Sequence, residues 1–372
     1  MQRPVYLDWN ATTPPHPDVV RAMSEATATA WGNPASVHAT GRAARARVED
    51  CREEIAALLG VHPRDVLFTS GGTEANNCAL NDAAGVVTSR LEHPSIVRAA
   101  EALERAGRPV HWLPVPARGC LEPDAVAEGL ASVPRGSWVA LTAVNHETGV
   151  VQPVPEVVEL ARRAGARVFV DAAQAVGKIE PKGYLGADRV ALAAHKLRGP
   201  KGIGALAWRS GLAPMPILHG GAQERGLRPG TVNAVAAAGF SAALRWARTA
   251  PSRYAALEPL RDDLERRLGP YASVNGAGAP RAPHVTNLSF TGARGDELVA
   301  ALDLAGVQIS SGSACSAGTS EPSPVVSAML GGDRARSAVR ISMGDETSAE
   351  ELERLITALF QLLEPCADHA LR

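Results

Sequence analysis

The chain has 372 residues, 45% of them hydrophobic, so it can bury more than one core and two domains are expected. Its 38 Lys and Arg nearly balance its 39 Asp and Glu, which argues against a general attraction to nucleic acid or to an anionic membrane. No stretch reaches the roughly 18 uninterrupted apolar residues of a spanning helix, and the first residues lack the apolar core of a signal peptide. These features predict a cytoplasmic protein without nucleic-acid or membrane partners.

From about residue 40 to 250, short β-branched runs alternate with amphipathic helical stretches, which is typical of an α/β fold with a mostly parallel sheet. The predicted strands are DVLFTS (65–70), GVVTS (85–89), WVALTAV (138–144), ARVFVDA (166–172) and DRVALAA (188–194). Each strand runs directly into a polar segment. Because ligands of open α/β sheets bind beyond the carboxyl ends of the strands, the chemistry is expected there.

After about residue 250 the pattern changes. A helix is predicted over 252–268, followed by VTNLSF, a stretch rich in Gly and Ser, AVRISM and a final helix over 348–363. This order of elements predicts a second, smaller α+β domain.

The segment FTSGGTEANN reads as a strand, a glycine turn and a helix start, with Gly72 and Thr73 at the turn. Free backbone N–H groups and the positive end of the helix dipole would make this turn a phosphate cradle. The alternative is that Gly71 and Gly72 only make a tight connection between strand and helix.

Asp171 ends the apolar strand ARVFVD, and Gln174 follows three residues later. A carboxylate at the mouth of a sheet is costly unless it meets a cation or several donors, and a protonated pyridine nitrogen would serve. The alternative for Asp171 is a helix N-cap.

Lys196, in ALAAHKLRGPKGIGAL, ends another apolar strand just before a glycine-rich turn. A lysine in a half-buried mouth is expected to have a lowered pKa, which favours the formation of Schiff bases. Lys201 is the competing candidate, but its place between Pro200 and Gly202 predicts an exposed turn.

The five cysteines are Cys51, Cys78, Cys120, Cys315 and Cys366. They form no CxxC pair, and their odd count argues against a disulfide framework and against a zinc or other metal site. Cys51 and Cys78 lie in helical patterns and are expected in the core. Cys315 lies in SSGSACSAGTSEPSP, a run of small residues without packing surface, which favours a nucleophilic thiol.

Together these segments resemble the cysteine desulfurases, a family of fold-type I, class V enzymes that depend on pyridoxal 5′-phosphate. The resemblance covers nearly the whole chain and keeps the family's order. It is carried by YLDWNATTP, GNPAS, FTSGGTEANN, EHPSI, VNHETGVVQP, VDAAQAVGK, AHKLRGPKGIGAL, HGGAQERGLRPGT, SSGSACSAG and AVRISMG. It implies a large PLP-binding α/β domain with a seven-stranded sheet over 14–250, and a small α+β domain over 1–13 and 251–372 that carries the cysteine loop.

The resemblance also implies roles for individual residues. Lys196 resembles the Schiff-base lysine, and Cys315 the thiol that accepts sulfur. The implied cofactor contacts are Asp171 to the ring nitrogen, Gln174 and Asn145 to the ring hydroxyl, His93 stacked on the ring, Gly72, Thr73 and His195 at the phosphate, and Thr231 lent across a homodimer interface. Arg340, helped by Asn33, resembles the clamp on the substrate carboxylate.

Two pairs of residues depart from the family's pattern. Ala193 and Ala194 precede the HK pair where many members have Ser-Gly, which removes a hydroxyl contact to the phosphate, so the affinity for the cofactor is modestly lower unless another donor compensates. Asp345 and Glu346 replace an arginine-aromatic pair and would change the electrostatics of substrate entry. The SSGSAC loop, with about ten small or turn residues after it, is similar to the family's long-loop group.

The implied activity is a sulfur transfer from L-cysteine that leaves L-alanine, a persulfide on Cys315, and sulfur for an acceptor protein. The acceptor could be an iron–sulfur scaffold, a tRNA thiolation enzyme or a biosynthetic carrier. Selenocysteine lyase and other class V enzymes, an aminotransferase or a kynureninase-like hydrolase, are alternatives. A non-catalytic scaffold for sulfur-carrier proteins is an alternative of another kind.

Overall fold

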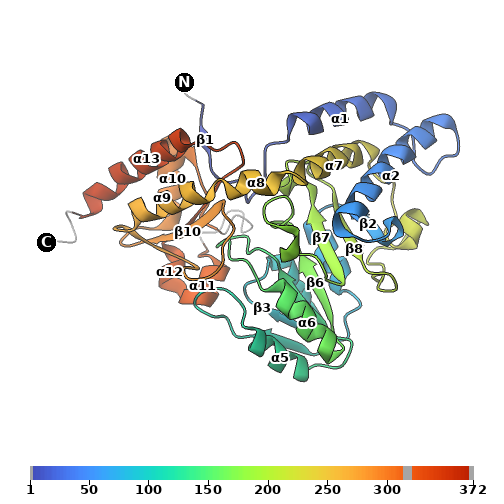
Figure 1. Ribbon diagram of the computed structural model, residues 1–372, viewed down its shortest axis with the longest axis horizontal. Helices are drawn as coiled ribbons and strands as arrows, with labels where there is room; N and C mark the ends of the chain where they lie inside the picture. The colour runs from blue at the N-terminus through green and yellow to red at the C-terminus, as the bar shows by residue number, and fades with distance from the viewer. Residues whose placement is uncertain (1–2, 313–320, 368–372) are drawn as a thin grey trace.

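The computed structural model describes residues 3–312 and 321–367, and a seven-stranded sheet is its largest element (Figure 1). The sheet order is β2-β8-β7-β6-β5-β3-β4; β8 is antiparallel to both of its neighbours and the other pairs are parallel. The strands are Val66–Thr69 (β2), Val86–Ser89 (β3), Val110–Leu113 (β4), Trp138–Thr142 (β5), Arg167–Asp171 (β6), Arg189–Ala193 (β7) and Gly204–Trp208 (β8). The predicted α/β fold with a mostly parallel sheet is confirmed.

The residue pattern predicts five of these strands and misses β4 and β8. The strand β4 contains His111 and lies at the sheet edge, where all of its side chains except that of Leu113 are only half-buried. The strand β8 starts at Gly204, where a Cβ atom would approach the backbone of Gly71 to 2.8 Å. Close packing against the neighbouring turn thus requires a residue that the strand pattern disfavours.

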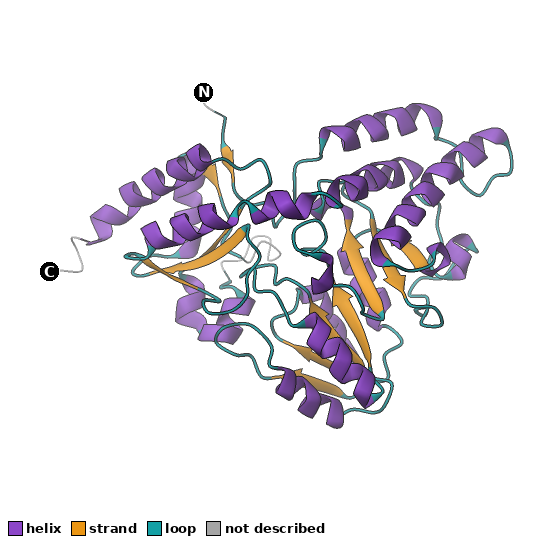
Figure 2. Ribbon diagram, viewed as in Figure 1, coloured by secondary structure: helices purple, strands orange, loops and turns teal. Residues whose placement is uncertain are grey.

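Helices cover both faces of the large sheet, in three layers (Figure 2). Along β5, Trp138 and Ala140 belong to the core with α3 (Gly72–Leu80) and α4 (Pro94–Arg105), whereas the alternate residues Val139 and Leu141 belong to the opposite core. This alternation follows from the period of two along a strand. The opposite core is formed with α1 (Pro17–Thr29), α2 (Ala39–Leu59), α5 (Pro123–Ala131), α6 (Val154–Ala164) and α7 (Ala234–Ala247).

A second core lies around a small antiparallel sheet in which β10 (Val285–Phe290) runs between β9 (Ala272–Val274) and β12 (Ala338–Ser342). The N-terminal strand β1 (Val5–Tyr6) pairs with β11 (Val307–Gln308), so the start of the chain packs against this C-terminal unit. The helices of this unit are α8 (Ala250–Ala255), α9 (Glu258–Leu268), α10 (Gly295–Leu304), α11 (Pro324–Leu330), α12 (Gly332–Arg336) and α13 (Ala349–Ala367).

The helix predicted over 252–268 is wrong in its continuity, because α8 ends at Ala255 and α9 begins at Glu258. Pro259 lies in the first turn of α9, where its missing N–H is tolerated, but within one continuous helix its ring would clash with the preceding turn. Short 3-10 turns complete the fold at Pro63–Asp65, Pro181–Gly183, Ala194–Lys196 and Gln223–Gly226.

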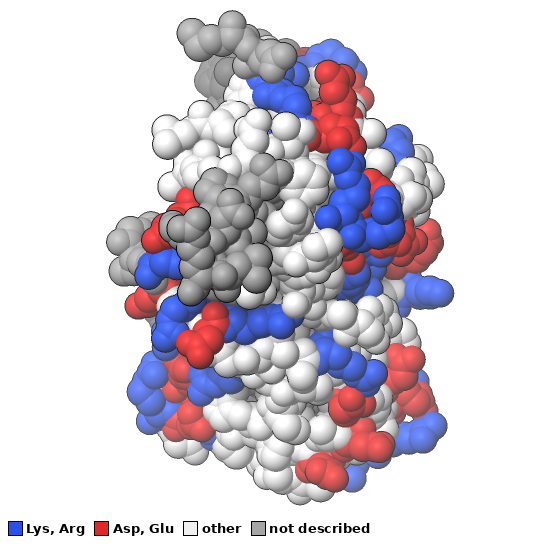
Figure 3. All heavy atoms as spheres, turned by 90° about the vertical axis from the view of Figure 1, so that its left-hand side faces the viewer, with Lys and Arg blue, Asp and Glu red and all other residues white. Residues whose placement is uncertain are grey.

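The surface shows no field of a single sign on the face drawn in Figure 3, where basic and acidic side chains are interspersed. This agrees with the near balance of charges in the sequence. In the part of the chain that the structure describes, no helix combines the length and apolar character needed to cross a membrane.

Candidate active site

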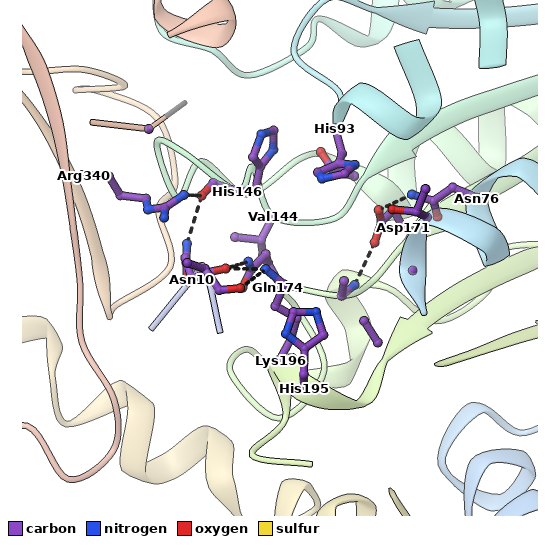
Figure 4. A pocket seen from close by; sticks show the side chains of 17 residues that line it. Asn10, Asn76, His93, Val144, His146, Asp171, Gln174, His195, Lys196 and Arg340 are labelled. Atoms are coloured by element: carbon purple, nitrogen blue, oxygen red, sulfur yellow. Dashed lines mark hydrogen bonds between the residues drawn. The ribbon is translucent and has the colours of Figure 1, made fainter. Parts of the chain in front are cut away.

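A cavity of about 320 Å³ lies beyond the carboxyl ends of β5, β6 and β7, between the large sheet and the C-terminal unit. Figure 4 shows Asp171 and Asn76 at one end of it and Arg340 at the other, with Gln174 and Lys196 between them. The lining residues are Asn10, Ala11, Gly72, Thr73, Asn76, His93, Thr142, Val144, His146, Asp171, Ala173, Gln174, Ala193, His195, Lys196, Gly312 and Arg340.

Asp171 is the last residue of β6 and is buried at the sheet end of the cavity. Its Oδ2 accepts a hydrogen bond from Asn76 Nδ2 at 2.7 Å, and its Oδ1 accepts one from the backbone N–H of Ala173 at 2.9 Å. It does not cap a helix in the structure, because a run of turns follows it. The carboxylate is thus held in place while it remains open to a further donor from the cavity.

His93 precedes α4 and caps it, with its Nδ1 accepting from the backbone N–H of Ser95 at 3.2 Å and lying 2.7 Å from Ser95 Oγ. The Ser95 hydroxyl also accepts from Asn76 Nδ2 at 2.8 Å, so His93 and Asp171 are joined through one amide group. Burial lowers the pKa of His93 below its usual 6.5, although the Asp171 carboxylate acts in the opposite direction. A neutral imidazole is therefore favoured at this end of the cavity.

Gly72 and Thr73 begin α3, whose N-cap Gly71 offers no side chain to the first turn. Among the described residues, no backbone oxygen or side chain accepts from the N–H groups of Gly72 and Thr73. Since unpaired N–H groups at a helix start favour an anion, this turn can bind a phosphate.

Lys196 and His195 follow β7 and face the cavity from below in Figure 4. Lys196 Nζ donates to the backbone oxygens of Asn10 at 2.5 Å and Ala11 at 2.9 Å. These two bonds fix the position of the amine beside the cavity, which Asn10 and Ala11 also line. Burial, together with the charge of Lys196, lowers the pKa of His195 to about 4. The competing Lys201 is exposed and does not line this cavity.

Arg340 reaches the cavity from β12 and is almost fully buried. Its Nη2 donates to Asp8 Oδ1 at 2.6 Å and its Nη1 to the backbone oxygen of His146 at 3.1 Å. Its Nε is buried without a hydrogen-bond partner among the described residues. A buried guanidinium with an unused donor is costly, and a ligand carboxylate would satisfy it.

Three predicted site residues do not line this cavity, and one lies outside the described residues. Asn145 Oδ1 accepts from the backbone N–H groups of Glu147 and Thr148, so its side chain closes a local turn. Asn33 and Thr231 are exposed, away from the cavity of their own chain. Cys315 falls within 313–320, outside the described ranges.

The structure adds His146, which the sequence interpretation missed. Its ring lines the cavity with a centroid 5.2 Å from that of His93, and its Nδ1 is buried without a partner among the described residues. Burial, with the charge of Arg340 adding to it, lowers the pKa of His146 well below 6.5. Asn10 and Asn76 were also missed, although both lie inside motifs already singled out.

The two departures from the family's pattern fall in different places. Ala193 lines the cavity near Gly72, where a hydroxyl would have faced the phosphate cradle. Asp345 and Glu346 do not line it; both accept from Arg198 Nη1, at 3.1 Å and 2.7 Å. The acidic pair therefore stabilises Arg198, whose φ of 61° lies in the left-handed region.

Comparison with known proteins identifies the family. The aminotransferase class-V model matches residues 5–355. The cysteine desulfurase IscS of Dictyoglomus turgidum is 35% identical, over 98% of this chain and 95% of the relative. The chain belongs to the cysteine desulfurases. Among solved structures, a NifS-like protein from Rickettsia africae has a TM-score of 0.88 at 28% identity, covering 97% of this chain and all of that one. SspA in complex with cysteine has a TM-score of 0.78 at 30% identity, covering 92% and 99%.

Cysteine desulfurases use pyridoxal 5′-phosphate, and the cavity's donor set fits this cofactor. The Asp171 carboxylate can bind the ring nitrogen, and the Lys196 amine can bind the aldehyde. The unpaired N–H groups at the start of α3 can bind the phosphate. Asn76 Oδ1 and Thr142 Oγ1 are also buried without hydrogen-bond partners among the described residues, as are His146 Nδ1 and Arg340 Nε. Because buried polar atoms are normally paired, four such atoms around one cavity indicate a polar ligand.

Proposed function

We propose that this chain is a cysteine desulfurase that takes sulfur from L-cysteine, releases L-alanine, and carries the sulfur as a persulfide on Cys315. The observation that carries the proposal is that Asp171 from β6, Lys196 from the turn after β7, and Arg340 from β12 line one cavity. The Lys196 amine and the buried Asp171 carboxylate can bind the aldehyde and the ring nitrogen of the cofactor. Arg340, at the other end of the cavity, can bind the carboxylate of an amino acid.

In this proposal, Asp171 would hold the ring nitrogen, Lys196 would hold the aldehyde carbon, and Gly72, Thr73 and His195 would hold the phosphate. Gln174 contacts the ring hydroxyl, and we infer that His146 contacts it in place of Asn145, because the Asn145 side chain is used in its own turn. His93 stacks on the ring. When bound, the cofactor draws electrons away from the substrate's Cα and so weakens its C–H bond.

The residues of this chain then act on the bound substrate. Arg340 binds the cysteine carboxylate through the Nε that has no partner, which orients the amino acid within the cavity. Lys196, as a free amine, takes the proton from Cα, and Asp171 keeps the ring nitrogen protonated by its negative charge. A neutral His93 can accept the proton of the substrate thiol.

Sulfur transfer is assigned to Cys315, on the evidence of its sequence context and of the family. The Cys315 thiolate attacks the substrate sulfur, so an S–S bond forms as the Cβ–S bond breaks. The electron pair of the broken bond stays with the carbon fragment, which is then protonated to alanine. Each sulfur is thereby oxidised and the carbon reduced, and no external oxidant is needed.

Two variants test this assignment. Lys196→Ala should lose the visible absorption of the bound cofactor, together with all alanine production. Cys315→Ser should keep that absorption, while sulfide and alanine production collapse by at least about a hundredfold, because the nucleophile is gone. A Cys315→Ser protein that forms alanine and sulfide at the parent rate would show that Cys315 is not the nucleophile. Cys51→Ser, at a buried cysteine whose pKa is raised by burial, is the matched control.

We further propose a cytoplasmic homodimer that hands sulfur to an acceptor protein, for example in iron–sulfur cluster assembly. Support for the dimer comes from Thr231, which is exposed and away from its own cavity, and from Trp31 and Val37, which are 74% and 82% exposed. Substituting Thr231 by Ala should weaken cofactor binding in a dimer without changing its sedimentation. A protein that sediments as a monomer at working concentration would contradict the proposal.

A further inference from the structure

Lys178 is a buried lysine with no assigned role. It is 2% exposed, and it lies in the run of turns that follows Asp171. Its Nζ donates to Gln174 Oε1 at 2.5 Å, and within the described part of the chain no carboxylate pairs with it. Burial, with the charges of Lys196 and Arg340 adding to it, lowers its pKa well below the usual 10.5. Such a group is costly to bury, so its position calls for an explanation.

The partner of Lys178 is a residue of the cavity wall. Gln174 Nε2 donates to the backbone oxygen of Asn10 at 2.8 Å. With Lys178 as donor on one side and the Asn10 carbonyl as acceptor on the other, only one orientation of the Gln174 amide satisfies both bonds. The second Nε2 hydrogen has no acceptor among the described residues, so it is available to the cavity.

The same carbonyl connects this pair to Lys196. The Asn10 oxygen accepts from both Gln174 Nε2 and Lys196 Nζ, at 2.8 and 2.5 Å. The Asn10 side chain is fixed as well, since Nδ2 donates to the His146 backbone oxygen at 3.1 Å and Oδ1 lies 3.3 Å from His284 Nε2. A single chain of contacts thus runs from the buried Lys178 amine to the amine that faces the cavity.

We propose that Lys178 is a positioning residue that holds the Gln174 amide with its N–H groups directed at Asn10 and at an acceptor oxygen of the bound cofactor. Without the Lys178 donor, Gln174 Oε1 would be buried and unpaired, and the amide would gain by turning its oxygen toward another donor. Turning the amide would place an oxygen against the Asn10 carbonyl or against the cofactor oxygen. The inference rests on the proposed function, because it assigns the direction of a contact within that site.

The test is a double-mutant cycle on cofactor affinity, measured by titrating cofactor-free protein with pyridoxal 5′-phosphate. Lys178→Met nearly keeps the volume of the side chain and removes the terminal amine, so the fold is expected to survive. Its affinity should fall roughly tenfold, the effect of about one lost hydrogen bond. In a Gln174→Ala background the same substitution should change affinity by less than about twofold, because Lys178 acts through Gln174. Lys182→Met, at an exposed lysine four residues on, is the matched control.

A second readout separates positioning from stability. The pH midpoint of the visible absorption of the bound cofactor should shift in Lys178→Met and in Gln174→Ala alike, and not in Lys182→Met. Equal affinity losses from Lys178→Met in both backgrounds, or an unchanged affinity and midpoint, would overturn the inference. A parent protein that binds no cofactor would instead overturn the proposed function, so the two failures are distinguishable.

Discussion

The two ends of the cavity are built in different ways. At the sheet end, Asp171, Asn76 and His93 are fixed by hydrogen bonds among residues of the large sheet and its helices. At the other end, Arg340 is held by Asp8 from the N-terminal segment and by the His146 carbonyl of the large unit. The sheet end is therefore organised within one unit, whereas the Arg340 end depends on three segments far apart in the chain. We expect changes at the first end to affect the chemistry and changes at the second to affect substrate binding.

The largest effect is expected at the sheet end, from Asp171→Asn. The amide keeps the shape of the side chain but removes the negative charge that would hold a proton on the ring nitrogen. The maximal rate of alanine formation should fall by about a hundredfold or more, with the Michaelis constant for cysteine changed by less than about threefold. Asp188→Asn, where Asp188 accepts from the Val168 N–H at the other end of β6, is the control. A fall confined to the Michaelis constant would remove the distinction between the two ends.

Arg340→Lys probes the other end of the cavity. Its effect should be smaller, and it should change the Michaelis constant for cysteine and not the maximal rate. Lysine keeps the charge but loses the planar fork and the Nε donor that has no partner. Losing one charge-assisted hydrogen bond costs about 1.5–3 kcal/mol, so the Michaelis constant for cysteine should rise about tenfold to a hundredfold. The maximal rate should change by less than about threefold.

Arg281→Lys provides the comparison for this substitution, because Arg281 binds Glu265 with two nitrogens and does not line the cavity. It should leave both kinetic constants unchanged. If Arg340→Lys lowers the maximal rate while the Michaelis constant stays at the parent value, Arg340 does not hold the substrate carboxylate in the ground state.

The two ends of the cavity also differ in how well their residues can be predicted from the sequence. Asp171, Gln174 and Lys196 follow apolar strands, and the carboxyl ends of parallel strands meet at one edge, so their convergence follows from the order of elements. The ion pair of Arg340 with Asp8 joins residues far apart in the chain, beside the bridge between Asp8 and Ser342. Contacts between such distant segments have no local pattern, so only the family resemblance suggested a role for Arg340.

Asn145 and His146 illustrate a second limit. The two residues are adjacent, and the family resemblance pointed to Asn145 as a cofactor contact. In the structure the Asn145 amide bonds to backbone groups two and three residues on, which is a common use of asparagine in turns. The neighbouring ring then lines the cavity. Which of two adjacent side chains faces a ligand depends on turn geometry that residue types alone did not determine.

The smallest effect is expected in the pH dependence of stability, and it again concerns the sheet end. His195 has a pKa of about 4 in the folded protein, below the roughly 6.5 of an unfolded chain, so below pH 6.5 the unfolded state binds more protons. Its contribution is complete above about pH 6.5 and is lost as the pH falls toward 4. Buried Glu147, whose pKa burial raises to about 7, acts in the opposite sense, since its contribution is lost as the pH rises from about 4.5 to 7.

Urea unfolding of the cofactor-free protein at pH 6.5 and pH 5 measures the His195 contribution. His195→Gln can keep a hydrogen bond to Thr12, which lies 3.1 Å from His195 Nδ1, and it removes the titrating group. The loss of unfolding free energy between the two pH values should be smaller in this variant than in the parent by about 1.5 kcal/mol. His219→Gln, at an exposed histidine, should lose as much as the parent. Equal losses in all three proteins would mean that folding does not lower the pKa of His195, and the uncharged state of its buried ring would have to be abandoned.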